Sequence, residues 1–180
     1  MNMILTFPKT NYVLADRKII FNLSLNHTDI NNKIIILSGE NGTGKTTFLE
    51  NIFLPILMKD NINYIYIGQD FNLQYHTIRT SLSIIHKKII KNDLKILLKD
   101  WFNLLLDNTI LMMDEFDKYF ENPNEIFELT SNHISSYILV SHNPNISSYA
   151  VRNYSKKVLN FSIVDIVEKT KKVNIKMDNL

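Results

Sequence analysis

The sequence contains no cysteine and carries a formal net charge of only +2 at pH 7. The lack of cysteine excludes a disulfide scaffold, a thiolate zinc site and a cysteine nucleophile. A net charge this small does not by itself indicate a nucleic-acid partner. No apolar run approaches the roughly 18 residues of a membrane-spanning helix, and the N-terminus lacks the basic and apolar regions of a signal peptide. We therefore expect a cytoplasmic protein, with any association with the inner face of a membrane made through a partner.

Glycine is scarce as well, since the 180 residues include only four. Gly39, Gly42 and Gly44 stand close together, directly after an apolar run at residues 33–38. Glycine adopts backbone conformations that other residues avoid. In a chain so poor in glycine, this cluster indicates a backbone segment with a special task.

Short apolar runs that alternate with amphipathic segments predict an α/β fold with a mostly parallel central sheet. We expect strands at residues 5–7, 18–25, 33–38, 64–67, 109–113 and 137–140, and a closing hairpin or bent strand over 158–161 and 163–167. Helices are expected at residues 45–58, 80–106 and 124–129, with a break near Asn92 where Asp93 caps a second helix. The polar tail from Lys169 is expected to be loose.

The glycine cluster fits the phosphate-loop motif G-x-x-x-x-G-K-[ST] at every fixed position, between a predicted strand and a predicted helix. In such a loop, backbone N–H groups and the helix N-terminus bind phosphate. Lys45 is placed to reach the β- and γ-phosphates, and the Thr46 hydroxyl to bind Mg²⁺. The residues expected to bind the phosphates of a nucleotide here are Gly39, Asn41, Gly42, Thr43, Gly44, Lys45, Thr46 and Thr47.

Polar residues also follow three other predicted core strands, where ligands of parallel sheets bind. Asp114 is expected to hold Mg²⁺ through water, and Glu115 to polarise the attacking water as a general base. Gln69 is expected to reach the metal or that water, and His142 to donate a hydrogen bond to the γ-phosphate. The alternatives are an ordinary loop role for Gln69 and a structural role for His142.

In this order the motifs resemble those of the ATP-binding cassette (ABC) ATPases. The phosphate loop matches Walker A, Gln69 the Q-loop, Asp114 and Glu115 the Walker B motif with its catalytic glutamate, and His142 the switch histidine. In that family an aromatic residue ahead of Walker A stacks on adenine, and Tyr12 is the candidate here. The resemblance implies one P-loop NTPase domain over residues 1–180, with an antiparallel β region at 3–30, a core at 33–69 and 109–167, and a reduced helical region at 78–107.

One feature of the family is missing, because the chain has no L-S-G-G-Q signature. The equivalent place lies near residues 90–94, which contain no glycine. Family members dimerise head to tail, and each signature covers the γ-phosphate bound by the partner. Asp93 would bring a negative charge toward that phosphate unless it is turned away as a helix cap. A dimer of another arrangement, or a partner subunit that supplies the signature, are the alternatives.

The resemblance implies an ATP-binding and ATP-hydrolysing subunit of an ABC-type transporter or related membrane complex, acting with Mg²⁺. It further implies a homodimer or heterodimer of ATPase subunits and a membrane-protein partner. One alternative is an ABC-like ATPase that acts on nucleic acid or another macromolecule, although the chain leaves no room for the long coiled coil of such relatives, so nucleic acid is not the expected partner. Another is a regulatory subunit that binds nucleotide and hydrolyses it poorly, which the lost signature favours.

A stripe of lysines is predicted to be a solvated helix face. It comprises Lys87, Lys88, Lys91, Lys95 and Lys99.

Overall fold

The computed structural model describes most of the chain. The described residues are 4–7, 10–14, 17–23, 27–88, 90, 92–121, 123–129, 133–143, 157–167 and 170–178. Within them, no helix is long and apolar enough to cross a membrane.

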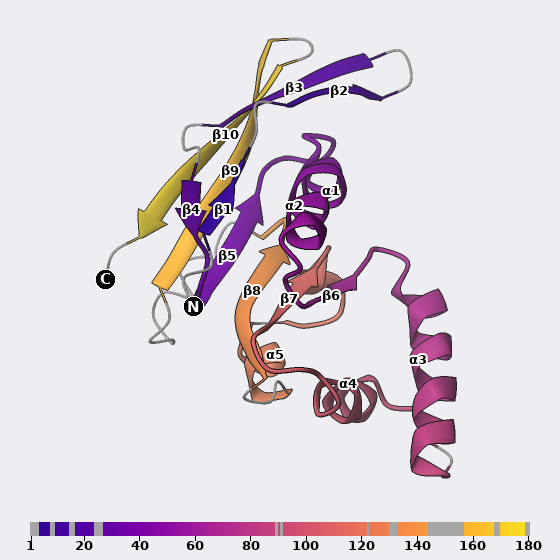
Figure 1. Cartoon of the computed structure of the whole chain (residues 1–180). Helices are drawn as coiled ribbons and strands as arrows, with labels where there is room; N and C mark the ends of the chain where they lie inside the picture. Colours follow the sequence, from indigo (N-terminus) through magenta and orange to yellow (C-terminus); the bar gives the residue numbers. More distant parts are fainter. Residues whose placement is uncertain are drawn as a thin grey trace.

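An eight-stranded sheet forms the centre of the molecule, in the order β2-β3-β10-β9-β5-β8-β7-β6 (Figure 1). The five strands from β9 to β6 are mutually parallel, while β10 and β2 add antiparallel pairs. A separate antiparallel pair joins β1 to β4. The strands are β1 (Ile4–Thr6), β2 (Thr10–Leu14), β3 (Arg17–Leu23), β4 (His27–Asp29), β5 (Lys33–Ser38), β6 (Tyr64–Ile67), β7 (Thr109–Met113), β8 (Ile134–Val140), β9 (Lys157–Val167) and β10 (Thr170–Asp178).

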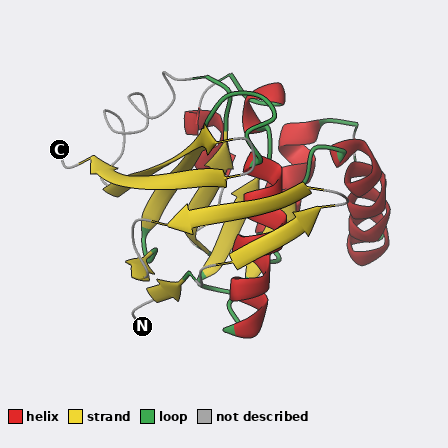
Figure 2. Cartoon of the chain, turned by 90° about the horizontal axis from the view of Figure 1, so that it is seen from above, coloured by secondary structure: helices red, strands yellow, loops and turns green. Residues whose placement is uncertain are grey.

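Helices cover both faces of this sheet, which explains why its central strands are apolar throughout. Along β5, Ile34 and Ile36 face one hydrophobic cluster, while Ile35 and Leu37 face the other. The first cluster lies under α3 (Phe71–His86), α4 (Leu94–Phe102) and α5 (Pro123–Leu129), and the second under the helix that follows the glycine cluster. Figure 2 shows the helices on both sides of the sheet. The expected α/β fold, with its parallel central sheet and antiparallel N-terminal region, is thus confirmed.

The helix after the glycine cluster is continuous but not uniform. It comprises α1 (Lys45–Phe48), a π-helical turn η1 (Leu49–Phe53) and α2 (Leu54–Lys59). Pro55 cannot donate a hydrogen bond to the carbonyl of Asn51, four residues before it, and the wider π turn lies directly ahead of it. The helix packs on the sheet through a cluster of buried rings, which comprises Phe7, Phe21, Phe48, Phe53 and Phe161.

Several sequence-based bounds are wrong, whereas the strand before the glycine cluster and the helix after it lie within one residue of the expected bounds. The first helical segment begins at Phe71, ahead of the expected Thr80, because Phe71 is anchored in the core although residues 71–79 show little apolar periodicity. Strands β2 and β4 were not predicted, and β8 begins at Ile134 ahead of the expected Tyr137. The expected break between helices is confirmed, since Asp93 caps α4 by accepting a hydrogen bond from the Ile96 N–H at 3.0 Å.

The C-terminal segment differs most from expectation. Residues 158–167 form one strand, β9, which is the second of the two expected alternatives, but the segment expected to be a loose tail forms β10. β10 pairs with β9 along its length and with β3 over residues 170–173, so the backbone groups of its first part are satisfied on two sides. Pairing with the preceding strand β9 and with the distant strand β3, which a tail considered alone does not reveal, makes the segment a strand.

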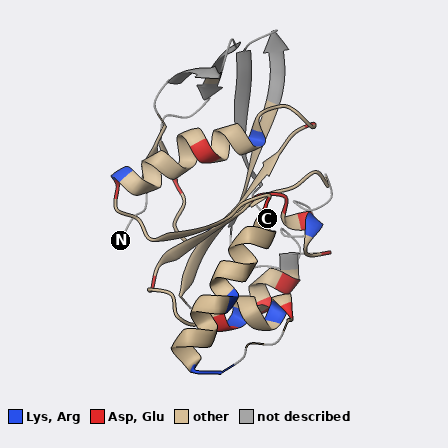
Figure 3. Ribbon diagram, turned by 90° about the vertical axis from the view of Figure 1, so that its right-hand side faces the viewer, with Lys and Arg blue, Asp and Glu red and all other residues tan. Residues whose placement is uncertain are grey.

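The helical layer carries mixed charge. The described lysines of the predicted stripe are exposed, as expected, while Lys91 lies outside the described residues. Lys95 in α4 forms an ion pair of 2.7 Å with Glu125 in α5. Basic and acidic residues accordingly lie side by side over these helices (Figure 3).

Candidate functional site

The glycine cluster forms a tight loop between β5 and α1. A Cβ atom at Gly39 would lie 2.8 Å from the backbone oxygen of Ile163 and 2.8 Å from the Thr43 hydroxyl, so no side chain fits there. Gly44 begins the helix in the left-handed region, at φ 94°. Two of the glycines are therefore required by the local backbone, as the motif predicts.

Lys45 crosses this loop on its inner side. Its Nζ donates to the backbone oxygens of Gly39 at 2.8 Å and Glu40 at 2.9 Å. Thr43 donates to the same Glu40 oxygen at 2.9 Å. Burial lowers the pKa of Lys45, and the carboxylates of Asp114 and Asp117 partly offset this effect. The loop is thus closed around a cation at its centre.

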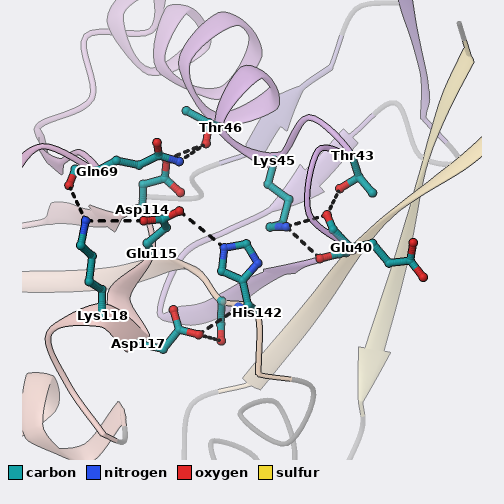
Figure 4. Close-up of polar contacts among 12 residues, drawn as sticks. Glu40, Thr43, Lys45, Thr46, Gln69, Asp114, Glu115, Asp117, Lys118 and His142 are labelled. Atoms are coloured by element: carbon teal, nitrogen blue, oxygen red, sulfur yellow. Dashed lines mark hydrogen bonds and ion pairs between the residues drawn. The ribbon is translucent and has the colours of Figure 1, made fainter.

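A line of hydrogen bonds joins the loop to two neighbouring strand ends. The Thr46 hydroxyl donates to Asp114 Oδ2 at 2.8 Å, and Gln69 Nε2 donates to the Thr46 oxygen at 2.8 Å (Figure 4). Asp114 follows β7, Gln69 follows β6, and Thr46 lies in α1. The parallel strands end at one edge of the sheet, which is why residues so far apart in sequence meet.

Asp114 has the properties of a magnesium ligand. Its side chain is fully buried, and its Oδ1 atom has no hydrogen-bond partner. Burial raises the pKa of Asp114, and the hydrogen bond from Thr46 acts in the opposite direction. A buried carboxylate oxygen without a partner beside a threonine hydroxyl fits the hard oxygen ligands that Mg²⁺ prefers. The residues present therefore fit the metal.

Glu115 is held in an unusual backbone conformation. Its φ is 50°, in the left-handed region that costs a residue with a side chain about 1 kcal/mol or more. Its Oε1 lies 3.6 Å from His142 Nε2 and its Oε2 lies 3.9 Å from Lys118 Nζ. The strained turn directs the Glu115 carboxylate toward the end of β8, where His142 lies.

Asp117 fixes the segment that carries His142. Its Oδ2 accepts hydrogen bonds from the Ser141 hydroxyl at 3.0 Å and from the His142 backbone N–H at 3.0 Å. The sequence pattern does not identify this role, because Asp117 is one of several acidic residues that follow β7. The helical turn η2 (Phe116–Lys118) brings it back over the strand ends. A turn directly after a strand that carries site residues is the signal that could have found it.

Gln69 is positioned by its own surroundings. The side chain of Gln74 donates to the Tyr66 oxygen at 3.0 Å and accepts from the Gly68 N–H at 3.1 Å. Because β6 is an edge strand, its outer backbone groups are open to a further strand, and the side-chain amide of Gln74 occupies two such groups at the end of β6. The Tyr119 hydroxyl donates a hydrogen bond to the backbone oxygen of Gln69 at 3.1 Å, which holds the backbone of this residue in place.

These groups surround a cavity of about 730 Å³. Most of the predicted site residues line it, whereas Gly39 and Thr43 support the loop from behind. Tyr12 lies in β2, but its side chain is outside the described part of the structure. The lining residues are Asn41, Gly42, Gly44, Lys45, Thr46, Thr47, Gln69, Asp114, Glu115, Asp117, Lys118 and His142.

The place of the missing signature is a loop folded against α3. Ile90 is buried, and its carbonyl accepts a hydrogen bond of 3.1 Å from Arg79 Nε. Tyr75 donates to Asn92 Oδ1 at 2.6 Å. Asp93 is turned back onto the first turn of α4. The N-terminus of α4 is therefore capped by a carboxylate of its own chain.

No family model and no curated protein match the sequence. Solved structures do match the fold. The dimeric post-hydrolysis ATP-binding cassette MJ0796 bound to ADP and Pi superposes with a TM-score of 0.54 at 12% identity, covering 98% of this chain and 99% of that one. A second dimeric structure of MJ0796, described as a bacterial ABC transporter cassette, gives 0.53 at 13% identity, covering 98% and 99%. The genome packaging NTPase B204 of Sulfolobus turreted icosahedral virus 2, in complex with ATP-gammaS, gives 0.49 at 18% identity, covering 76% of this chain and 78% of that one. The chain thus has the fold of the P-loop NTPases.

Proposed function

We propose that this protein binds MgATP in the cavity and hydrolyses it. The observation that carries the proposal is the hydrogen-bonded line from Gln69 through Thr46 to Asp114, with both contacts at 2.8 Å. It joins a phosphate loop to the strand ends where P-loop enzymes place their metal and water ligands. Tyr12 is proposed to stack on the adenine ring.

Each residue around the cavity receives one role in this proposal. Thr46, Asp114 and Gln69 would hold Mg²⁺, which when bound neutralises part of the phosphate charge. Glu115 accepts a proton from the attacking water as the general base. His142 lies 3.6 Å from the Glu115 carboxylate and donates a hydrogen bond to the γ-phosphate.

The test is the pair of variants Glu115→Gln and Lys45→Ala. E115Q removes the base but keeps the shape of the side chain, so turnover should fall by about 10²–10⁴ with ATP affinity unchanged. K45A removes a charge-assisted contact to phosphate, so affinity should fall by about 10–100-fold. Glu128→Gln, at an exposed position of α5, is the matched control. Normal turnover in E115Q would remove the assigned base, and full affinity of K45A by calorimetry would contradict the role of the loop.

The finer proposal is an ABC-type subunit that works with a membrane protein. A second hollow of about 450 Å³ lies between the edge strand β6 and the helices α3 and α4. Leu73, which lines it, is 76% exposed, and Trp101 on its other side is half-buried. In the family that the motifs resemble, the transporter docks beside the Q-loop, and this hollow begins a few residues from Gln69. The resemblance supports a membrane protein as the occupant.

Recovery of the tagged protein from solubilised membranes tests that partner. A multi-span membrane protein should accompany the wild-type chain and be lost with Leu73→Glu. Ile84→Glu is the control, because Ile84 is also exposed on α3, at 71%, but does not line the hollow. Equal recovery with both variants would contradict docking at this place, and recovery of nucleic acid would favour the alternative of a nucleic-acid ATPase.

A second candidate is a regulatory subunit that holds ATP with little turnover. The observation that favours it is the Asp93 cap, because this carboxylate accepts the Ile96 N–H and places a negative charge at the N-terminus of α4, which repels a phosphate bound by a partner chain. An ABC-type dimer, if it forms, therefore needs another arrangement or a different chain as partner. Tight ATP binding with no turnover, both alone and with the recovered partner, would establish this candidate over the first.

A further inference from the structure

The cavity is rich in negative charge. Asp114, Glu115 and Asp117 all line it, and a nucleoside triphosphate would add several more negative charges. Among the described lining residues there is no arginine, and the lysines are Lys45 and Lys118. Lys45 belongs to the phosphate loop. Lys118 has no role in the motifs or in the function proposed above.

The two lysines lie on different sides of the acids. Lys45 Nζ is held by the loop oxygens of Gly39 and Glu40. The Lys118 amine lies on the opposite side, between the backbone oxygen of Gln69 and the Glu115 carboxylate (Figure 4). Lys118 therefore brings positive charge to the wall of the cavity that the loop lysine does not reach.

The present contacts of Lys118 are weak and easily exchanged. Its Nζ lies 3.5 Å from the backbone oxygen of Gln69 and 3.9 Å from Glu115 Oε2, and its side chain is 55% exposed. Exposed ion pairs of this kind contribute little to stability, whereas a contact from an ammonium group to a phosphate oxygen is a strong charge-assisted hydrogen bond. A phosphate group in the cavity would therefore compete well for this amine.

We propose that Lys118 binds the terminal phosphate of ATP and so lets the protein distinguish a nucleoside triphosphate from a diphosphate. This inference rests on the proposed function, because it assumes that ATP occupies the cavity. Lys118 contacts Glu115 and Gln69, the residues assigned to the water and the metal, and its amine also lies 5.8 Å from the centre of the Tyr119 ring. A cation supplied by the same chain takes the place of the hydrogen-bond donors that a partner's signature would bring.

The test compares affinities for ADP and for a non-hydrolysable ATP analogue, measured by calorimetry with Mg²⁺ in the wild type and in Lys118→Met. K118M should weaken the analogue about tenfold, the lower end for a charged hydrogen bond at a half-exposed position, and leave ADP affinity within about twofold. Lys118→Arg should restore most of the difference. Lys99→Met, at an exposed position of α4, should leave both affinities unchanged.

Other outcomes overturn the inference. Equal loss for both nucleotides would mean that Lys118 acts on the shape of the cavity. Unchanged affinities with a shifted pH profile of turnover would mean that it acts only through Glu115. A wild-type protein that binds neither nucleotide, and that K45A does not alter, would refute the proposed function itself. A wild type that binds and hydrolyses ATP while K118M keeps its preference for the analogue would refute the Lys118 inference alone.

Discussion

Replacing Asp114 by asparagine is expected to stabilise the protein when no nucleotide or metal is bound, while destroying the metal site. Asp114 is fully buried, and only one of its two oxygens has a hydrogen-bond partner. Leaving a buried polar group unpaired costs about 1–3 kcal/mol, and more when it is charged. Asparagine keeps an oxygen for the Thr46 hydroxyl without the charge. We expect the free energy of unfolding to rise by about 1–2 kcal/mol, which for a chain of this size raises Tm by about 2–8 °C.

The pH dependence gives this prediction a second, independent measurement. Because burial raises the pKa of Asp114, the folded protein binds the proton more tightly than the unfolded chain does. Stability should therefore fall as the pH rises from the ordinary carboxyl pKa of 3.8 through the raised value, and this part of the fall should be absent in D114N. Above this pH range Asp114 is charged in the folded wild type, so D114N should there exceed the wild type by the full difference of about 1–2 kcal/mol in its free energy of unfolding.

Thermal unfolding with and without MgATP is the assay. The wild type should gain stability from MgATP, and D114N should gain much less, since it lacks the carboxylate that fits Mg²⁺. Asp60→Asn, which removes an exposed carboxylate after α2, should change stability by no more than about 0.5 kcal/mol. A D114N protein no more stable than the wild type in EDTA would refute the reasoning, because it would mean that the fold itself compensates the buried charge.

Substitutions at three further positions test other parts of the structure. Phe48→Ala should cost about 3–5 kcal/mol in chemical denaturation, because Phe48 is fully buried among the aromatic rings beneath the phosphate loop, and a smaller loss would mean that the cluster collapses around the cavity. Asp93→Ala should cost about 1 kcal/mol through loss of the α4 cap, and if it raised turnover it would show that the carboxylate hinders catalysis. Asp117→Ala should reduce turnover by misplacing His142, whereas Asp117→Asn should retain most of it because the amide oxygen still accepts from Ser141 and from the His142 N–H; equal activity of the two variants would contradict the positioning role.

The sequence by itself determined the parts of this protein that depend on local chemistry. The glycines, Lys45 and Thr46 could be placed because a phosphate loop needs those residue types at fixed spacing. Asp114, Gln69 and His142 could be placed because each follows a short apolar run, and parallel buried strands end at one edge of the sheet. That the structure brings these side chains together follows from the topology, although their roles toward ATP stay predictions.

Only the tertiary structure decided the features that depend on distant segments. β10 has an alternation of polar and apolar residues at 172–177 that favours a half-buried strand, but its polar composition predicts a loose tail. Besides the neighbouring strand β9 it pairs with β3, and this long-range pairing is the part that the local sequence does not predict. Asp117 and Lys118 face the cavity because a single helical turn folds back over the strand ends, and nothing in their local sequence requires it. Short-range patterns record which backbone a segment prefers, whereas long-range pairing and packing decide which side chains meet.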